Sequence, residues 1–167
     1  PTDWAKEGIC FVIENGLMVG TTSTTFAPKD TLTRAMLVTV LYRMAGKPSV
    51  SGISNPFTDV KKGPYYDAIL WAYCNGVTNG ISDTVFGVDN GCTRAQIVTF
   101  LYRAAGSPEL AKDAANPFSD VSDSSVYYNA ILWAVEKKIT TGVTGTTFVP
   151  NDTCTRAQAV TFLFRAK

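Results

Sequence analysis

The chain has 167 residues, 46% hydrophobic and 17% charged, so it can bury the core of one compact domain. Its net charge of +1 predicts neither the basic surface of a nucleic-acid-binding protein nor an affinity for anionic membranes. Histidine is absent and no apolar run approaches the length of a membrane span. These features argue against most hydrolases, zinc enzymes and membrane-inserted proteins.

The sequence is built from three copies of one unit. Segments 16–43, 76–103 and 138–165 align without gaps, at offsets of 60 and then 62 residues. Asn-Pro-Phe-Thr-Asp-Val at 55–60 returns as Asn-Pro-Phe-Ser-Asp-Val at 116–121. The first unit opens at Pro-Thr-Asp-Trp without this motif, so we expect the sequence to begin inside a unit. The three predicted repeats are 1–50, 51–111 and 112–167.

The first helix of a unit is clearest in the second and third copies, where apolar residues surround much of segments 65–76 and 127–134. Gly16 and Gly76 follow this helix, at the position of a left-handed cap. Lys138 replaces the glycine in the third unit and predicts a different ending or a small strain. The tryptophans inside the apolar runs are predicted core residues: Trp71 and Trp133.

A turn-rich loop follows, and it contains one glycine common to all three units. That glycine either supplies a positive φ to a turn or lets a ligand approach backbone amides. The residues alone favour the turn. The three positions are Gly20, Gly80 and Gly142.

The second helix begins at a Thr-Arg-Ala motif. Thr93 with Gln96, and Thr155 with Gln158, fit the Ser/Thr-x-x-Glu/Gln capping box, whereas Met36 takes the glutamine place in the first unit. An Ala-Gly-x-Pro stop ends this helix in the first and second units.

These elements follow one another through nearly the whole chain: Phe-x-Asp-Val, an aromatic helix, Gly-x-x-x-Gly, Phe-x-Pro and Thr-Arg-Ala-Gln. The pattern closely resembles the S-layer homology repeat, normally found in threes on bacterial surface proteins. The resemblance implies a mainly α fold, with three helix-loop-helix repeats packed as a pseudo-threefold trimer within one chain. Periodicity alone leaves an open solenoid and a closed ring as alternatives.

The resemblance also implies a function. A protein of this kind is a non-catalytic, extracellular anchoring module of the cell wall or S-layer, and it needs no cofactor. It binds secondary cell-wall polysaccharide, often pyruvylated, in grooves between repeats. Two alternatives remain: a protein-interaction scaffold in surface-layer assembly, or the wall-binding tail of a larger surface enzyme.

All six arginines occupy two positions of the unit. Arg43, Arg103 and Arg165 fall in a last helical turn, where a cation complements the helix dipole, so a structural role is predicted. The other three lie in a first turn, where a cation opposes the dipole. They suit a carboxylate from a glycan or from Asp59 or Asp120, and the resemblance favours the glycan. These arginines are Arg34, Arg94 and Arg156.

The resemblance extends the candidate glycan site to other positions of the unit. Aromatic residues near the start of the first helix stack on sugars or fill cores. The two aspartates are more simply interpreted as caps of the turn before the first helix than as a catalytic pair. The additional candidates are Gly20, Gly80, Gly142, Gln96, Gln158, Asp59, Asp120, Trp4, Tyr66 and Tyr128.

The four cysteines form no Cys-x-x-Cys pair, so a metal site is not expected. Cys92 and Cys154 occupy the position of Leu32, which favours reduced thiols in the core. A surface location would also permit disulfides, with Cys10 or Cys74 as partners.

Overall fold

The computed structural model describes residues 3–167. Within that range it is mainly helical, with isolated β-bridges and no sheet. Six α-helices and one short 3-10 helix follow one another along the described chain: η1 (Asp3–Ala5), α1 (Lys6–Glu14), α2 (Arg34–Met44), α3 (Tyr66–Cys74), α4 (Arg94–Ala104), α5 (Tyr128–Glu136) and α6 (Arg156–Arg165).

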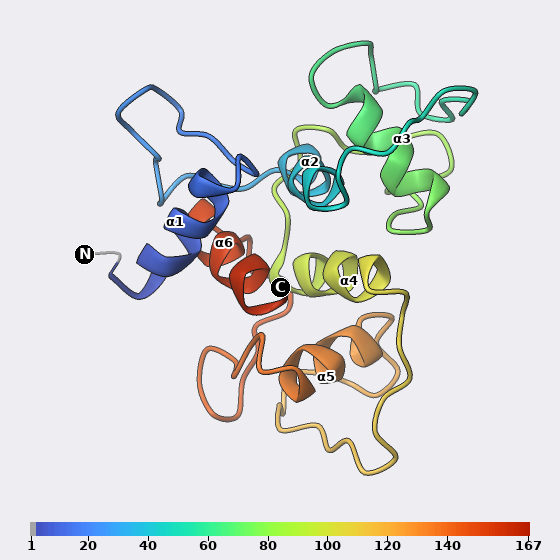
Figure 1. The fold of residues 1–167 in the computed structure, drawn as a ribbon. Helices are drawn as coiled ribbons and strands as arrows, with labels where there is room; N and C mark the ends of the chain where they lie inside the picture. Colours follow the sequence, from blue (N-terminus) through green and yellow to red (C-terminus); the bar gives the residue numbers. More distant parts are fainter. Residues whose placement is uncertain (1–2) are drawn as a thin grey trace.

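The second helices of the three repeats, α2, α4 and α6, lie at the centre of the molecule (Figure 1). The first helices, α1, α3 and α5, lie outside them. Each inner helix packs on an outer helix of another repeat: α2 on α3, α4 on α5, and α6 on α1. The expected helix-loop-helix repeat is present, but its two helices do not pack closely on each other, because the long loop carries the second helix away from the first.

One aromatic pair lies in each of these helix–helix contacts. Trp71 and Trp133 are 8% and 5% exposed, which confirms that they are core residues. The ring centroids are 5.6–5.8 Å apart in the pairs Tyr42–Trp71, Tyr102–Trp133 and Phe11–Phe164.

Backbone hydrogen bonds join the segments that precede the three inner helices. The amide of Cys92 donates to the carbonyl of Leu32 at 2.8 Å, and the amide of Cys154 donates to Cys92 at 2.9 Å. Leu32 then donates to the carbonyl of Cys154 at 3.0 Å, so the bonds form a closed cycle.

The two cysteines of this cycle are free thiols and at most 1% exposed. Burial raises the pKa of Cys92 to about 12 and that of Cys154 to about 11, so both remain protonated near neutral pH. The prediction of core thiols is confirmed at both positions. Cys10 and Cys74 are exposed and also free.

The helix ends follow the predicted chemistry. Complete capping boxes start α4 and α6, while Met36 leaves only the threonine half of the box at the start of α2. Lys138 adopts a φ of +57°, where Gly16 and Gly76 have +62° and +69°. The third repeat therefore keeps the same ending and bears the predicted strain. None of the described helices is long and apolar enough to cross a membrane.

Candidate functional site

Three grooves open beside the inner helices, and we name each after the helix that forms its floor. The α4 groove has a volume of about 470 Å³, the α6 groove about 380 Å³ and the α2 groove about 280 Å³. Each is lined by the arginine that begins one inner helix, by the glycine-containing loop, and by the face of another inner helix. Residues just before an outer helix or in η1 complete the lining.

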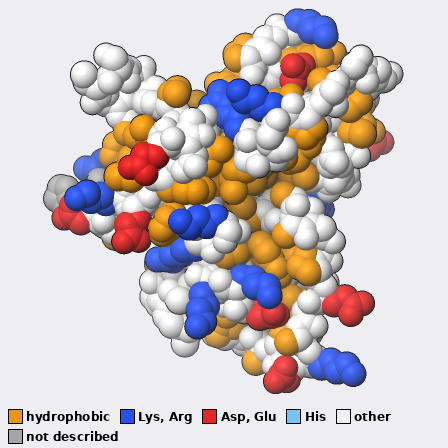
Figure 2. All heavy atoms as spheres, in the orientation of Figure 1, with side chains coloured by type: hydrophobic (Ala, Val, Ile, Leu, Met, Phe, Trp, Pro, Cys, Tyr) orange, Lys and Arg blue, Asp and Glu red, His pale blue; other side chains and the backbone are white. Residues whose placement is uncertain are grey.

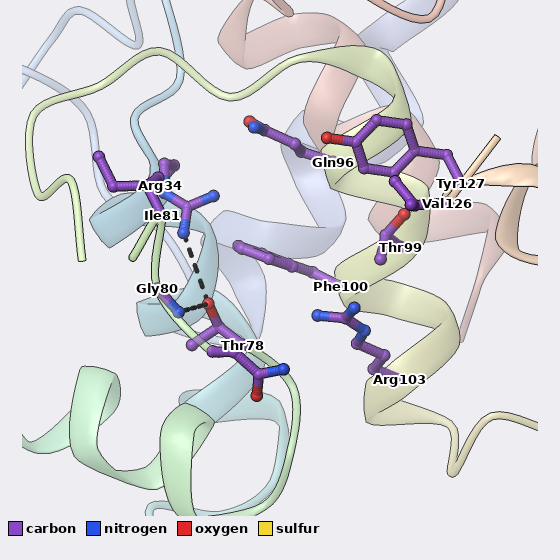
Figure 3. Close-up of a pocket in the computed structure, with 11 residues that line it drawn as sticks. Arg34, Thr78, Gly80, Ile81, Gln96, Thr99, Phe100, Arg103, Val126 and Tyr127 are labelled. Atoms are coloured by element: carbon purple, nitrogen blue, oxygen red, sulfur yellow. Dashed lines mark hydrogen bonds between the residues drawn. The ribbon is translucent and has the colours of Figure 1, made fainter. Parts of the chain in front are cut away.

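Figure 3 shows the α4 groove. Arg34 enters it from the start of α2, and the loop of the second repeat forms the adjoining wall. Four residues of α4 at positions i, i+3, i+4 and i+7 form the floor, because this spacing places them on one helix face. They are Gln96, Thr99, Phe100 and Arg103.

The arginine at the start of each inner helix is buried. Arg34 is 3% exposed, and its Nε donates to the carbonyl oxygen of Phe86 in the next repeat at 3.0 Å. Its guanidinium carbon lies 5.0 Å from the ring centroid of Phe86 and 5.1 Å from that of Phe100. Burial lowers the pKa of Arg34. This arginine therefore joins two repeats as well as lining a groove.

The other two arginines make the same main contact. Nε of Arg94 donates to the carbonyl of Phe148 at 2.7 Å, and Nε of Arg156 donates to that of Phe26 at 2.9 Å. Their outer nitrogens differ: Nη2 of Arg156 donates to the carbonyl of Val19 at 2.8 Å. Nη2 of Arg94 is buried without a hydrogen-bond partner in residues 3–167.

Asp59 and Asp120 do not pair with these arginines and do not line the three grooves. The Asp59 carboxylate accepts the amides of Phe86 at 2.8 Å and Gly87 at 2.7 Å, and Asp120 makes equivalent bonds in the third repeat. Partial burial acts to raise the pKa of Asp59, but these amides hold it below its ordinary value.

The expected capping role of the two aspartates is therefore wrong. They fasten the loop of their own repeat, and α3 and α5 begin without a side-chain cap. Within residues 3–167 the one ion pair joins Lys137 to Glu136 at 3.3 Å, so the internal ion pairs considered for the arginines do not form.

The grooves are positively charged. Each is lined by two arginines, and no Asp or Glu is among the described residues that line them. On the face in Figure 2, Lys and Arg side chains occur near the middle beside hydrophobic ones, whereas Asp and Glu lie mainly toward the outline. Hydroxyl, amide and aromatic groups accompany the guanidinium groups, which is the chemistry expected of a site for an acidic, hydroxyl-rich ligand.

The other predicted site residues separate into two groups. Trp4 lines the α6 groove and is 58% exposed, whereas Tyr66 and Tyr128 lie outside the grooves. Their preceding neighbours, Tyr65 and Tyr127, line the α2 and α4 grooves instead. Besides Trp4, the residues of this group that line a groove are Gly20, Gly80, Gly142, Gln96 and Gln158.

Gly80 and Gly142 serve the fold as well as the grooves. Both have positive φ, and an added Cβ would lie 2.7 and 2.6 Å from the Cε1 atoms of Phe57 and Phe118. Only glycine therefore fits at these two positions, where the phenylalanine of the Asn-Pro-Phe-x-Asp-Val motif packs under the loop.

Sequence reasoning missed the arginines at the helix ends, which line the grooves although a dipole role alone was predicted. It also missed the threonine of each helix floor. A signal was present, because the i, i+3, i+4, i+7 set recurs in the second and third repeats. The missed residues are Arg43, Arg103, Arg165, Thr39, Thr99 and Thr161.

Comparisons with known proteins identify the family of the repeats. The sequence model of the S-layer homology domain matches residues 1–35, 56–98 and 117–160. A cell surface protein of Thermoanaerobacter kivui is 38% identical over 117 residues, which are 68% of this chain and 15% of that protein. An endoglucanase of Bacillus sp. (strain KSM-635) is 33% identical over 162 residues, which are 95% of this chain and 17% of the enzyme.

A surface-layer 125 kDa protein of Lysinibacillus sphaericus is 31% identical over 115 residues, or 66% of this chain and 10% of that protein. This chain thus spans less than a fifth of the length of these relatives. The matches identify a cell-wall anchoring module that is located outside the cell, in the wall or surface layer. The chain belongs to the S-layer homology domain family, as its repeats predicted.

Proposed function

We propose that the three grooves bind an acidic secondary cell-wall polysaccharide and so attach the parent protein to the wall. The observation that carries this proposal is the charge of the grooves: two arginines line each one, and no described carboxylate does. A pyruvylated sugar supplies a carboxylate that a guanidinium group binds through two hydrogen bonds. The ring hydroxyls would meet the threonine and amide groups beside it.

The two arginines of a groove have different tasks in this proposal. Arg103 is half-buried and Arg165 is exposed, so they are accessible to a ligand at the ends of α4 and α6. Arg34 and Arg94 are nearly covered and add positive charge from beneath. The carboxamides of Gln96 and Gln158 keep donors for the ligand, because only their oxygens cap the helices.

The aromatic residues complete each groove. Tyr65, Tyr127 and Trp4 lie at its edge, where a flat ring can stack on the apolar face of a sugar. Of the predicted aromatic residues, only Trp4 has such a position. Asp59 and Asp120 would act on the ligand only through the loops that they fasten, and Tyr66 and Tyr128 lie outside the grooves.

The three repeats, with boundaries near 1–50, 51–111 and 112–167, are arranged in this proposal about a pseudo-threefold axis. The closed cycle of hydrogen bonds through Leu32, Cys92 and Cys154 supports it, as does the contact between α1 and α6. In such an arrangement residues of all three repeats line each groove, so no single repeat contains a complete site.

The chain itself is proposed to be non-catalytic. The endoglucanase relative supports this, because only 17% of the enzyme is matched by nearly the whole of this chain. Assays of the isolated chain for polysaccharide hydrolysis should therefore show no activity. A protein-interaction scaffold remains the competing function, and it predicts that attachment survives removal of the wall polymer.

Binding to purified cell-wall sacculi tests the proposal. The double variant Arg103→Ala plus Arg165→Ala should lose at least about tenfold in affinity, because two charge-assisted contacts are removed at accessible positions. A control variant, Lys29→Ala plus Lys112→Ala, removes the same charge from exposed positions outside the grooves and should bind as wild type does. Sacculi stripped of their polysaccharide should bind neither the wild-type chain nor the lysine control.

Two results would contradict the proposal. If stripped sacculi retain the chain, the binding partner is not the polysaccharide. If the double arginine variant and the lysine control bind equally well, the grooves are not the site.

A further inference from the structure

The arginine at the end of an inner helix is fastened to the chain in two of the three grooves. Nη1 of Arg43, in the α2 groove, donates to the carbonyl of Leu17 at 2.9 Å. Nη1 of Arg165, which lines the α6 groove, makes the equivalent bond to the carbonyl of Ile139 at 3.3 Å. A ligand that binds either guanidinium group through the same nitrogen must therefore replace a bond within the chain.

Arg103, at the same position in the α4 groove, has no such bond. Its side chain is half-buried, yet within residues 3–167 it makes neither a hydrogen bond nor an ion pair. The carbonyl that corresponds to those of Leu17 and Ile139 belongs to Val77, and no donor among the described residues bonds to it. All the donors of the Arg103 guanidinium group are therefore available to a ligand.

A second guanidinium group lies near Arg103 in the same groove. Arg34 enters from the start of α2, its guanidinium carbon lies 5.1 Å from the ring centroid of Phe100, and Figure 3 shows this ring between the two arginines. Burial lowers the pKa of Arg34, and the positive charge of Arg103 acts in the same direction. The two like charges therefore repel each other, and no described carboxylate lines the groove to separate them.

The sequence accounts for part of the difference between the grooves. The amide of each buried arginine donates to the carbonyl of one equivalent residue, which is Asp30 for the α2 groove, Asn90 for the α4 groove and Asp152 for the α6 groove. Burial lowers the pKa of all three arginines, and the charge of Asp30 or Asp152 opposes this shift in two grooves. Asn90 provides no such charge, so the α4 groove lacks a compensation that the other two have.

We infer that the α4 groove is the principal ligand site of this chain, where Arg34 and Arg103 hold one carboxylate of an acidic sugar between them. The α2 and α6 grooves bind the same sugar more weakly. This inference rests on the proposed function and ranks its three sites. One anion neutralises two neighbouring charges in the α4 groove, and it meets donors that no carbonyl of the chain occupies.

Retention of single variants on cell-wall sacculi tests this ranking. Arg103→Ala should lose at least about tenfold in affinity, whereas Arg43→Ala and Arg165→Ala should each lose less than about threefold. Lys29→Ala removes one charge from an exposed position outside the grooves and should bind as wild type does.

The stability of the variants should follow a different order. Arg43→Ala breaks a hydrogen bond within the chain and should lower the urea unfolding midpoint, whereas Arg103→Ala breaks none and should leave the midpoint close to that of wild type. A loss of binding in Arg103→Ala can then be assigned to the ligand contact and not to unfolding.

A soluble acidic sugar tests the same residue without the wall. The probe is methyl glucoside carrying a pyruvate ketal, and its methyl ester is the uncharged control. In a chain with ¹⁵N-labelled arginine, the ketal should shift the Nε resonance of Arg103 at a concentration at least about tenfold lower than it needs for Arg43 or Arg165. The ester should shift none of the three.

Three results would overturn the inference and leave the proposed function standing. They are equal losses of retention in the three single variants, equal shifts of the three resonances along the ketal titration, and equal effects of the ketal and its ester. Retention of the wild-type chain by sacculi stripped of polysaccharide would contradict the proposed function instead. The ketal titration would then still decide whether Arg103 is the preferred carboxylate site.

Discussion

The α4 groove and the α2 groove have the same plan and different walls. Each is lined by a buried arginine whose Nε donates to a phenylalanine carbonyl of another repeat: Arg34 to Phe86 in the α4 groove, and Arg156 to Phe26 in the α2 groove. The α2 groove has methionine or valine where the α4 groove has glutamine, threonine or phenylalanine. The replaced positions are Gln96/Met36, Thr78/Met18 and Phe100/Val40.

This difference separates two roles of the repeat. The arginine and its carbonyl partner are the same in all three copies, because they join one repeat to the next. A changed groove wall leaves this contact between repeats intact, so the walls can differ from copy to copy. The grooves are therefore expected to differ in affinity, and the α2 groove to be the weakest site for a hydroxyl-rich ligand.

The largest predicted effect concerns the hydrogen bond between a buried arginine and the phenylalanine carbonyl of another repeat. Arg34→Ala and Arg156→Ala should each lower the free energy of unfolding by about 3 kcal/mol, because each leaves a buried carbonyl without a donor and a cavity beside a ring. Arg103→Ala, at the half-buried end of the α4 groove, should cost less than about 1 kcal/mol. Urea unfolding measures all three values. Equal losses in the three variants would contradict the distinction between arginines that connect repeats and arginines that only line a groove.

A second prediction concerns the loop that forms a wall of the α4 groove and that the Asp59 carboxylate fastens. Hydrogen bonds to a charged acceptor are strong, and here they are partly exposed, so Asp59→Asn should cost about 1 kcal/mol at pH 7. The pKa of Asp59 is lower in the folded chain than in the unfolded chain. Its contribution is therefore complete above about pH 4 and disappears as the pH falls through the folded value.

The measurement is urea unfolding of wild type and variant between pH 7 and pH 2. The two curves should converge at the acid end, since a protonated aspartate resembles asparagine. Asp123→Asn, on an exposed side chain that fastens no loop, should follow the wild type throughout. A difference between wild type and Asp59→Asn that grows toward low pH would have the wrong sign.

Whether a structural feature can be predicted from the sequence depends on how far apart along the chain its residues lie. The capping boxes at Thr93 and Thr155 and the core tryptophans are local patterns, and they were predicted. At Lys138 the sequence left open a different ending or a small strain, and the structure shows the strain. Which helices pack together was not predicted, because packing within a repeat and packing between repeats would bury the same apolar stripes. Only loop length and long-range contacts decide between them.

The candidate site shows the same limit. Arg34 was singled out because its charge opposes the helix dipole, yet its partner is a carbonyl 52 residues away, which no local pattern indicates. Tyr66 was chosen where Tyr65 lines a groove, because a shift of one residue turns a side chain by about 100° around a helix. Helix periodicity fixes the spacing of a face but not which face meets the groove.

A third prediction concerns the loop of the α6 groove, which begins after the strained Lys138. Lys138→Gly should raise the free energy of unfolding by about 1 kcal/mol, because a non-glycine residue at a φ of +57° is disfavoured by that order. The reciprocal change, Gly76→Lys, should cost a similar amount, since nothing lies within 4 Å of an added Cβ there. Thermal unfolding of both variants measures this, and changes of the same sign would contradict it.

The smallest predicted effect comes from a substitution that gives the α2 groove the glutamine found in the α4 groove. Met36→Gln should complete the capping box of α2, because the Thr33 hydroxyl already accepts the amide of residue 36 at 3.2 Å and the Thr33 amide has no partner in residues 3–167. The expected gain is about 0.5 kcal/mol in the free energy of unfolding. Met36→Leu, which keeps the volume without an acceptor, is the matched control, and a gain of the same size would show that packing rather than capping is responsible. If the grooves bind glycan, Met36→Gln should also increase retention on sacculi, because the carboxamide nitrogen would face the groove as that of Gln96 does in the second repeat.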